Sequence, residues 1–258
     1  MNKTALITGA SLGIGMELAH VFAAKKENLV LVARSVSKLN EMAKEIAIKY
    51  GVKVDVIALD LSENESAKKV FAYCEQHNLK VDYLVNNAGF GDFGFFAQSN
   101  WDKQLQMINL NITTLTHLTH LFLPSMIKNK YGRIMNVAST AAFQPGPTMS
   151  VYYATKAFVL HFSEAIANEL EGSGVTVTAL CPGATESGFQ LAAAMEESKL
   201  VKGKKLPTSA EVAEYGYKAM MKCEKVAIHG FLNALMANSI RFTPRSLVLK
   251  MVRMMQDK

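Results

Sequence analysis

Three glycines near the amino terminus limit the folds open to this chain more than any other feature. They follow the apolar run at residues 4–8 with the spacing G-x-x-x-G-x-G, at Gly9, Gly13 and Gly15. A helical apolar pattern begins at Ile14. Glycines let the backbone turn sharply and approach a pyrophosphate, whose charge then lies at the positive end of the helix. The pattern predicts a strand, loop and helix that bind a dinucleotide; a βα turn that only needs glycine is the alternative.

Short apolar runs alternate with helical patterns along the rest of the chain. The runs expected to form strands are residues 4–8, 28–33, 52–59, 81–85, 133–137, 175–180 and 226–228. Helices are expected at about 37–50, after Asp60, at about 101–123, around Tyr152, at 208–222 and at 244–258. Such alternation with short connections requires a parallel sheet with right-handed crossovers. The predicted fold class is therefore α/β, a single Rossmann-type doubly wound parallel sheet flanked by helices on both faces, as one domain over residues 1–258.

Two of these helices have a predicted capping box at their start. Ser62 precedes Glu65 by three residues, and Thr208 precedes Glu211 by three. In such a pair the hydroxyl and the carboxylate each accept a hydrogen bond from the other residue's backbone N–H.

Composition excludes several classes of protein. With 50% hydrophobic and 19% charged residues in 258, the chain can bury a large core. Its net charge of +6 is scattered, without the aromatic and basic interleaving of a nucleic-acid site, so no nucleic-acid partner is predicted. The three cysteines are far apart, which favours a reducing, cytoplasmic location over disulfides. His117 and His120 have no third ligand nearby, so no metal is predicted.

Tyr152 and Lys156 are the first candidates for chemistry. They are four residues apart in a helical pattern, so their side chains share one face. An ammonium close to a phenol favours the phenolate and is expected to lower the pKa of Tyr152. Ser139 follows the strand expected at 133–137, at its carboxyl end. A surface tyrosine beside a solvated lysine is the alternative interpretation.

Six motifs occur together in a fixed order. They are Thr8-Gly9-x-x-x-Gly13-x-Gly15, Asn86-Asn87-Ala88-Gly89, Asn111, Ser139, Tyr152-x-x-x-Lys156 and Pro182-Gly183. In order and spacing the chain resembles the short-chain dehydrogenase/reductase family, over nearly its whole length. The resemblance implies an oxidoreductase that transfers a hydride between a nicotinamide and a carbonyl or alcohol carbon.

By this resemblance four residues are the predicted catalytic set. Tyr152 would donate the proton in the reducing direction, and Ser139 would give a second hydrogen bond to the substrate oxygen. Lys156 would lower the pKa of Tyr152 and hold the nicotinamide ribose hydroxyls. Asn111 would anchor a proton-relaying water beside Lys156.

The predicted cofactor-binding residues come from the same motifs. They are Gly9, Ser11, Leu12, Gly13, Ile14, Gly15, Arg34, Asp60, Leu61, Asn87, Ala88, Gly89, Tyr152, Lys156, Pro182, Gly183, Thr185 and Ser187. The family often has threonine four residues after the glycine of Pro-Gly, where this chain has Ser187 with Thr185 nearby. Which of the two hydroxyls contacts the carboxamide is left open.

Arg34 predicts NADP(H) as the cofactor, in preference to NAD(H). Sites that prefer NAD place a carboxylate roughly 20 residues beyond the glycine loop, to bind the ribose hydroxyls. Here Arg34 stands 21 residues beyond Gly13, and no carboxylate follows until Glu41. Arg34 can fork two hydrogen bonds to a 2′-phosphate, with Ser35 and Lys38 close by. Alternatively, Arg34 stacks on the adenine and tolerates either cofactor.

The substrate is expected to be a small molecule that is apolar around its carbonyl, such as a 3-oxoacyl, sterol-like or aromatic ketone. An aromatic run occupies residues 89–96, and Phe143, Met149, Phe189, Leu191 and Met195 stand in other segments near the expected cleft. The alternative is that several of these side chains fill the core.

Two further segments have predicted roles. Residues 184–206 are expected to form a mobile lid over the cofactor and substrate. Residues 244–258 are expected to form an amphipathic basic helix; a membrane-surface role is open, without stable insertion, and packing against the body or a partner subunit is favoured. The resemblance also implies a homodimer or homotetramer, built by the Asn111 and Tyr152 helices.

Two other classes of protein remain as alternatives. Residues 9–13 match G-x-S-x-G, which suggests a serine hydrolase, but only ten residues precede Ser11 and no HGGG-like segment is present. The other alternative is a catalytically inactive NADP-binding or sensing protein that keeps the fold.

Overall fold

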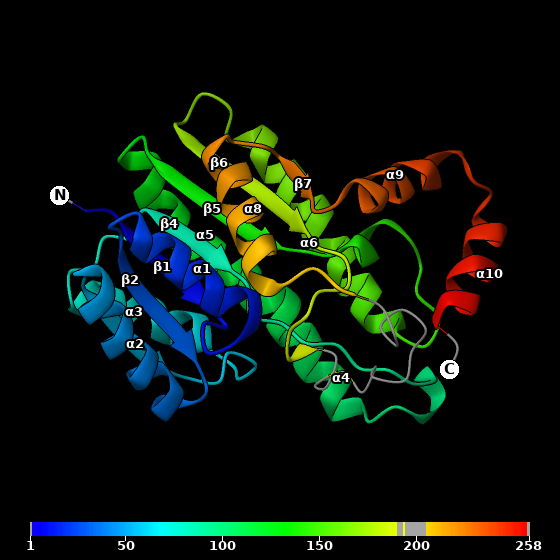
Figure 1. The fold of residues 1–258 in the computed structure, drawn as a ribbon, viewed down its shortest axis with the longest axis horizontal. Coiled ribbons are helices and arrows are strands. Elements are labelled where there is room, and N and C mark those ends of the chain that lie inside the picture. The colour runs from blue at the N-terminus through cyan, green and yellow to red at the C-terminus, as the bar shows by residue number, and fades with distance from the viewer. Residues whose placement is uncertain (1, 190–192, 194–204, 257–258) are drawn as a thin grey trace.

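The computed structural model describes residues 2–189, 193 and 205–256. The described residues form a seven-stranded parallel sheet in the order β3-β2-β1-β4-β5-β6-β7 (Figure 1). The strands are β1 (Thr4–Thr8), β2 (Asn28–Ala33), β3 (Val54–Ala58), β4 (Tyr83–Asn86), β5 (Gly132–Val137), β6 (Val175–Cys181) and β7 (Val226–Ile228). The predicted doubly wound parallel sheet is confirmed.

Helices cover both faces of this sheet (Figure 1). They are α1 (Gly13–Ala24), α2 (Val36–Tyr50), α3 (Ser66–Gln76), α4 (Trp101–Ile108), α5 (Leu115–Lys128), α6 (Ser150–Glu169), α8 (Ser209–Met221), α9 (Phe231–Ser239) and α10 (Arg245–Gln256). A π-helical segment, Asn109–Thr114, joins α4 to α5.

Strand β1 shows why the central strands are apolar along their whole length. Ile7 packs into the cluster formed with α1, α2 and α8, whereas its neighbour Leu6 packs into the cluster formed with α3, α5 and α6. Successive side chains of a strand point to opposite faces, and both faces of this sheet are covered. Strand order reverses between β1 and β4, where the carboxyl ends of the strands open a crevice suited to ligands.

The two predicted capping boxes have opposite outcomes. At α8, Glu211 N donates to Thr208 Oγ1 at 3.2 Å and Thr208 N donates to Glu211 Oε2 at 2.8 Å, which confirms the box. The box at Ser62 is wrong, because Ser62 N and Oγ both donate to Asp60 Oδ1, at 2.9 and 2.7 Å. Helix α3 begins only at Ser66, after Glu65 adopts a φ of 61°.

Two features of the helices differ from the sequence predictions and affect the site, whereas the favoured packing of the carboxyl-terminal helix on the body is confirmed. The helix expected at 101–123 contains the π-helical segment and continues to Lys128. Helix α9 was not predicted, although Phe231, Leu232, Leu235 and Met236 recur at helical intervals. The carboxyl-terminal helix α10 packs on the body through Val248 and Val252. None of the helices in the described residues is both long and apolar enough to cross a bilayer.

Candidate active site

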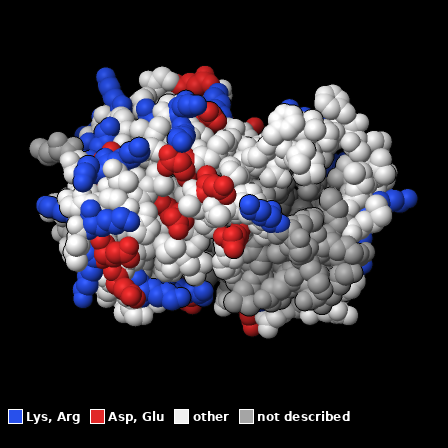
Figure 2. Space-filling model, viewed as in Figure 1, with Lys and Arg blue, Asp and Glu red and all other residues white. Residues whose placement is uncertain are grey.

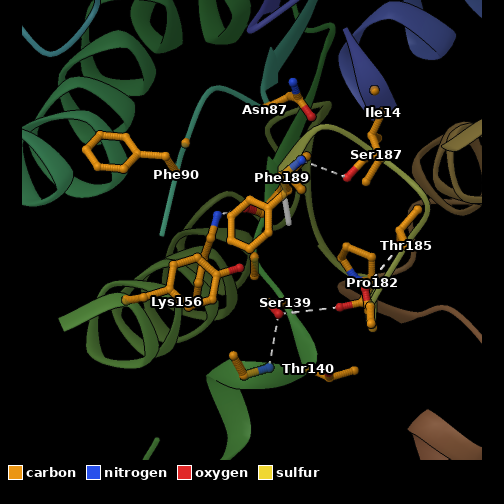
Figure 3. Close-up of a pocket in the computed structure, with 18 of the residues that line it drawn as sticks. Ile14, Asn87, Phe90, Ser139, Thr140, Lys156, Pro182, Thr185, Ser187 and Phe189 are labelled. Atoms are coloured by element: carbon orange, nitrogen blue, oxygen red, sulfur yellow. Dashed lines mark hydrogen bonds between the residues drawn. The ribbon is translucent and has the colours of Figure 1, made fainter. Parts of the chain in front are cut away.

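A cleft of about 1210 Å³ opens at the carboxyl ends of the strands and extends to α9 and α10. Figure 3 shows part of its lining, with Ile14, Asn87, Ser139, Lys156 and Pro182 drawn from separate elements. Every residue of the predicted catalytic and cofactor-binding sets lines this cleft except Gly15 and Asn111. Those two are buried directly behind its wall.

The glycine loop brings the backbone of β1 and α1 close to the cleft. Gly9 and Gly13 have φ values of 65° and 59°, a conformation that favours glycine. A Cβ on Gly15 would collide with the Gly9 carbonyl oxygen and with Asn87 Nδ2. Helix α1 has neither a side-chain cap nor an acidic residue in its first turn, so its first N–H groups and its positive dipole end are left for an anion.

Thr8 and Asn87 brace this loop against the end of β4. Thr8 Oγ1 accepts hydrogen bonds from Asn87 N and Ala88 N, both at 3.0 Å. Asn87 Nδ2 donates in return to Thr8 O at 2.9 Å and to Gly9 O at 3.2 Å. The two strand ends beside the crevice are thereby held in one geometry.

Arg34 stands at the far end of the same cleft, after β2. Its side chain is 81% exposed, and Nη1 lies 3.9 Å from Asp60 Oδ2. Burial raises the pKa of Asp60, but the hydrogen bonds from Ser62 and the charge of Arg34 lower it below its ordinary value. Ser35 and Lys38 also line this end. The glycine loop and this basic end are the two parts of the cleft on which the prediction of NADP(H) rests.

Ser139, Tyr152 and Lys156 meet in the middle of the cleft. Ser139 Oγ accepts from Ala141 N at 3.1 Å and donates to Pro182 O at 3.4 Å. The Ser139 hydroxyl also lies close enough to the Tyr152 phenol to lower its pKa. Lys156 Nζ donates to Val137 O at 2.7 Å and lies 5.8 Å from the centre of the Tyr152 ring. Both Tyr152 and Lys156 are buried, so the alternative of a solvated surface pair is wrong.

The predicted effect of Lys156 on Tyr152 is corrected by the structure. Burial raises the pKa of Tyr152 above its usual value, and the nearby Ser139 hydroxyl only partly opposes that rise. Burial also lowers the pKa of Lys156 to about 8, against a smaller opposite effect of Cys181. Removing both groups from water disfavours both charged forms, and the Lys156 ammonium is directed at the Val137 carbonyl. In this geometry Tyr152 is a protonated donor at neutral pH.

Asn111 lies in the π-helical segment between α4 and α5. Its Nδ2 donates to Phe90 O and to Thr155 Oγ1, both at 3.0 Å, and its Oδ1 accepts from Phe90 N at 3.2 Å. A Cβ on Gly89 would lie 2.9 Å from Asn111 Oδ1 and 3.5 Å from Lys156 Nζ. The segment thus brings the side-chain oxygen Oδ1 of Asn111 and the ammonium of Lys156 close to Gly89, where a Cβ would have to displace the Asn111 amide.

The loop after β6 separates the two hydroxyls that the sequence left undecided. Thr185 Oγ1 donates to Gly183 O at 3.0 Å. Ser187 instead lies at the start of α1, since a Cβ on Gly13 would be 3.3 Å from Ser187 Cβ. In Figure 3 Ser187 is beside Ile14, and Thr185 is beside Pro182.

The apolar half of the cleft agrees only in part with the sequence prediction. Phe90, Met149 and Phe189 line it, and the Phe189 ring centre is 5.2 Å from that of Tyr152. Phe143 was wrongly placed there, because it packs against a core cluster below the cleft. Phe95 and Phe96 are exposed. Leu191 and Met195 lie outside the described residues, as does most of the predicted lid.

The sequence interpretation missed the contribution of the carboxyl-terminal helices to the cleft. The lining residues from these helices are Leu232, Asn233, Met236, Ala237, Ser239, Val248, Met251 and Val252. The apolar repeat between residues 231 and 236 is the signal that could have revealed α9. Only the fold could show that this helix returns to the cleft.

Fold and site together define an α/β protein with a dinucleotide cradle and a Ser–Tyr–Lys set in one cleft. Comparison with known proteins agrees, since a family model described as short chain dehydrogenase matches residues 3–198. The chain belongs to the short-chain dehydrogenase family. This membership confirms the resemblance seen in the sequence and excludes the serine hydrolase alternative.

Named relatives include two enzymes and one solved complex. The very-long-chain 3-oxoacyl-CoA reductase of Phaeosphaeria nodorum is 38% identical over 177 residues, covering 67% of this chain and 52% of that protein. The 7beta-hydroxysteroid dehydrogenase of Collinsella aerofaciens is 35% identical over 180 residues, covering 70% and 68%. A short-chain dehydrogenase from Sphingobium yanoikuyae, solved in complex with NADPH, matches with a TM-score of 0.85 at 31% identity, covering 95% and 94%. The matched part of this chain spans 52–60% of the first four curated relatives.

Proposed function

We propose that this protein is an NADP(H)-dependent oxidoreductase that interconverts a carbonyl and a secondary alcohol on an apolar small molecule. One observation carries the proposal: half-buried Ser139 and buried Tyr152 and Lys156 line the same cleft as the glycine loop. A dinucleotide cradle and a proton donor with a second hydroxyl are the two parts that carbonyl reduction requires.

The residues have separate roles in this proposal. When bound, the nicotinamide would supply or accept the hydride. Tyr152, kept protonated by burial, would donate its proton to the substrate oxygen, and Ser139 would stabilise the charge developing there. Lys156 would hold ribose hydroxyls, with Asn111 ordering a proton-relaying water beside it. Thr185 and Ser187 would contact the nicotinamide and pyrophosphate ends.

The substrate proposal rests on the apolar walls of the cleft. Phe90, Met149, Phe189 and Val252 surround the side of Tyr152 away from the glycine loop. Such walls suit 3-oxoacyl, sterol-like or aromatic ketones. The named relatives act on a 3-oxoacyl-CoA and on a hydroxysteroid, which are substrates of that kind.

A panel of carbonyls and alcohols, assayed with NADPH and with NADH, tests the function. We expect turnover of a bulky apolar ketone with NADPH and little turnover of a small polyhydroxy sugar. Cofactor binding without turnover of any panel member would instead favour the inactive NADP-binding protein. A preference for the sugar would contradict the apolar substrate.

The pKa of Lys156 gives a prediction for pH dependence. If the ammonium holds the cofactor, kcat/KM for NADPH should fall as pH rises through about 8, because Lys156 is then losing its proton. Lys156→Arg should move this fall to higher pH, because a guanidinium stays charged. Initial rates between pH 6 and 10 measure both profiles. A fall that stays at the same pH in Lys156→Arg would show that another group titrates.

We also propose a cytoplasmic homodimer or homotetramer, in which α4, α5 and α6 supply the subunit contacts. Cys74, Cys181 and Cys223 are all free thiols in the described residues, as a reducing compartment allows. A mass measurement in solution tests the oligomer.

A further inference from the structure

The carboxyl-terminal arm, residues 230–256, exposes large apolar side chains that the cleft does not use. Phe231 is 81% exposed and Phe242 is 90% exposed, and Leu235, one helical turn beyond Phe231, is also exposed. None of these three lines the cleft, which takes Leu232 and Met236 from the neighbouring side of α9. The arm therefore has an inner apolar side over the cleft and an outer one facing solvent.

The charges of the arm all have one sign. Residues 230–256 contain Arg241, Arg245, Lys250 and Arg253, with no acidic residue before Asp257; Arg253 lies over the Phe95 ring of the body. Figure 2 shows mostly uncharged atoms over α9, whereas acidic and basic side chains mix over the left half of the face in view. An exposed apolar surface with basic residues at its edge complements an anionic lipid surface.

The body holds the arm in the orientation that such docking needs. Val248 and Val252 of α10 are buried in the cluster that contains Met149 and Tyr152. Leu247 and Met254 stay exposed on another side of the same helix. The inner side thus closes one wall of the cleft, and Leu232, Met236 and Met251, which line the cleft and are also exposed, form its rim next to the outer apolar side.

We propose that the arm docks on an anionic phospholipid surface, with Phe231, Leu235 and Phe242 inserted among the lipids and the basic residues over the headgroups. The cleft then opens at the lipid surface, so an apolar substrate reaches Tyr152 without crossing water; this delivery role rests on the proposed function. A second copy of the arm is a poorer partner, because a symmetric contact would bring the positive charges of both copies together.

Sedimentation with vesicles tests the docking on the full chain. Vesicles of phosphatidylcholine and phosphatidylglycerol in a ratio of about 3:1 should bind the protein, and pure phosphatidylcholine vesicles should bind it much less. Phe231→Asp with Phe242→Asp should weaken binding by at least about tenfold. Arg241→Gln with Arg245→Gln should weaken it by about 25-fold, at about fivefold for each charge.

Helix α2 offers matched controls. Ile48 is 87% exposed, and Lys44 and Lys49 flank it on the body surface. Ile48→Asp and Lys44→Gln with Lys49→Gln should bind the vesicles like the unmutated protein. The arm variants should keep their turnover of a water-soluble ketone, since their residues lie outside the cleft lining.

Three results would overturn the proposal. The first is that the protein does not bind the anionic vesicles. The second is that the α2 control variants lose as much vesicle binding as the arm variants, which would show that binding depends only on net charge. The third is that the unmutated protein does not bind vesicles and the arm variants have a lower mass in solution. The arm would then be an interface between copies of the chain. Sedimentation measures binding without turnover. A protein that binds vesicles but turns over no substrate would therefore contradict the proposed function and still support the docking.

Discussion

Tyr152→Phe is expected to lower kcat for carbonyl reduction by roughly 10²- to 10⁴-fold, the usual contribution of a general acid. The substitution removes one hydroxyl and keeps the ring, which packs 5.2 Å from the Phe189 ring and 6.1 Å from the Tyr153 ring. Because the pKa of Tyr152 is raised by burial, the group lost is a protonated donor across the neutral range. Fold and cofactor affinity should be preserved.

Single-turnover rates measure the loss of proton donation, and a fluorescence titration with NADPH measures cofactor affinity separately. Tyr153→Phe is the matched control, since Tyr153 is the next residue of α6 and also lines the cleft. Its kcat should change by less than about tenfold, because its hydroxyl is not the proposed donor. Near-full turnover by Tyr152→Phe would remove Tyr152 from the mechanism.

Arg34→Asp is expected to weaken NADPH binding far more than NADH binding. A bidentate charged contact is worth about 1.5–3 kcal/mol, or roughly 10- to 150-fold in affinity. Arg34 is 81% exposed, so solvent screening places the loss in the lower part of that range, and the new carboxylate adds repulsion of the 2′-phosphate.

The ratio of kcat/KM for NADPH and NADH measures this preference. Arg34→Gln is a useful intermediate, because it removes the charge without adding repulsion, and its ratio should lie between those of the other two proteins. Equal or better use of NADH by the unmutated protein would instead agree with Arg34 stacking on the adenine.

Local sequence patterns were enough to predict the layered fold. A strand buried on both faces must be apolar throughout, and a covering helix must repeat its apolar residues every three or four positions, so both can be recognised in a short window. The capping box at Thr208 and Glu211 is equally local, since its partners are three residues apart. The capping box predicted at the start of α3 was wrong because Asp60, a competing local partner, accepts the hydrogen bonds of Ser62.

The site residues could be found because backbone geometry and chemistry restrict them to few residue types. Gly9 needs a positive φ, and Gly15 leaves no room for a Cβ. A motif can therefore indicate which residues meet at the carboxyl ends of the strands. It cannot give their burial, on which their ionisation depends, so the expected lowering of the pKa of Tyr152 was wrong.

The sequence by itself determined the seven strands and most of the helices between them, the glycine cradle and the chemical groups available for a reaction. Only the tertiary structure decided that Tyr152 and Lys156 are removed from water, that half-buried Phe143 packs against a core cluster and that α9 and α10 line the cleft. The physical reason is distance along the chain. Periodicity and capping act within a few residues, whereas burial and ionisation depend on side chains more than 50 positions away, as Val252 beside Tyr152 illustrates.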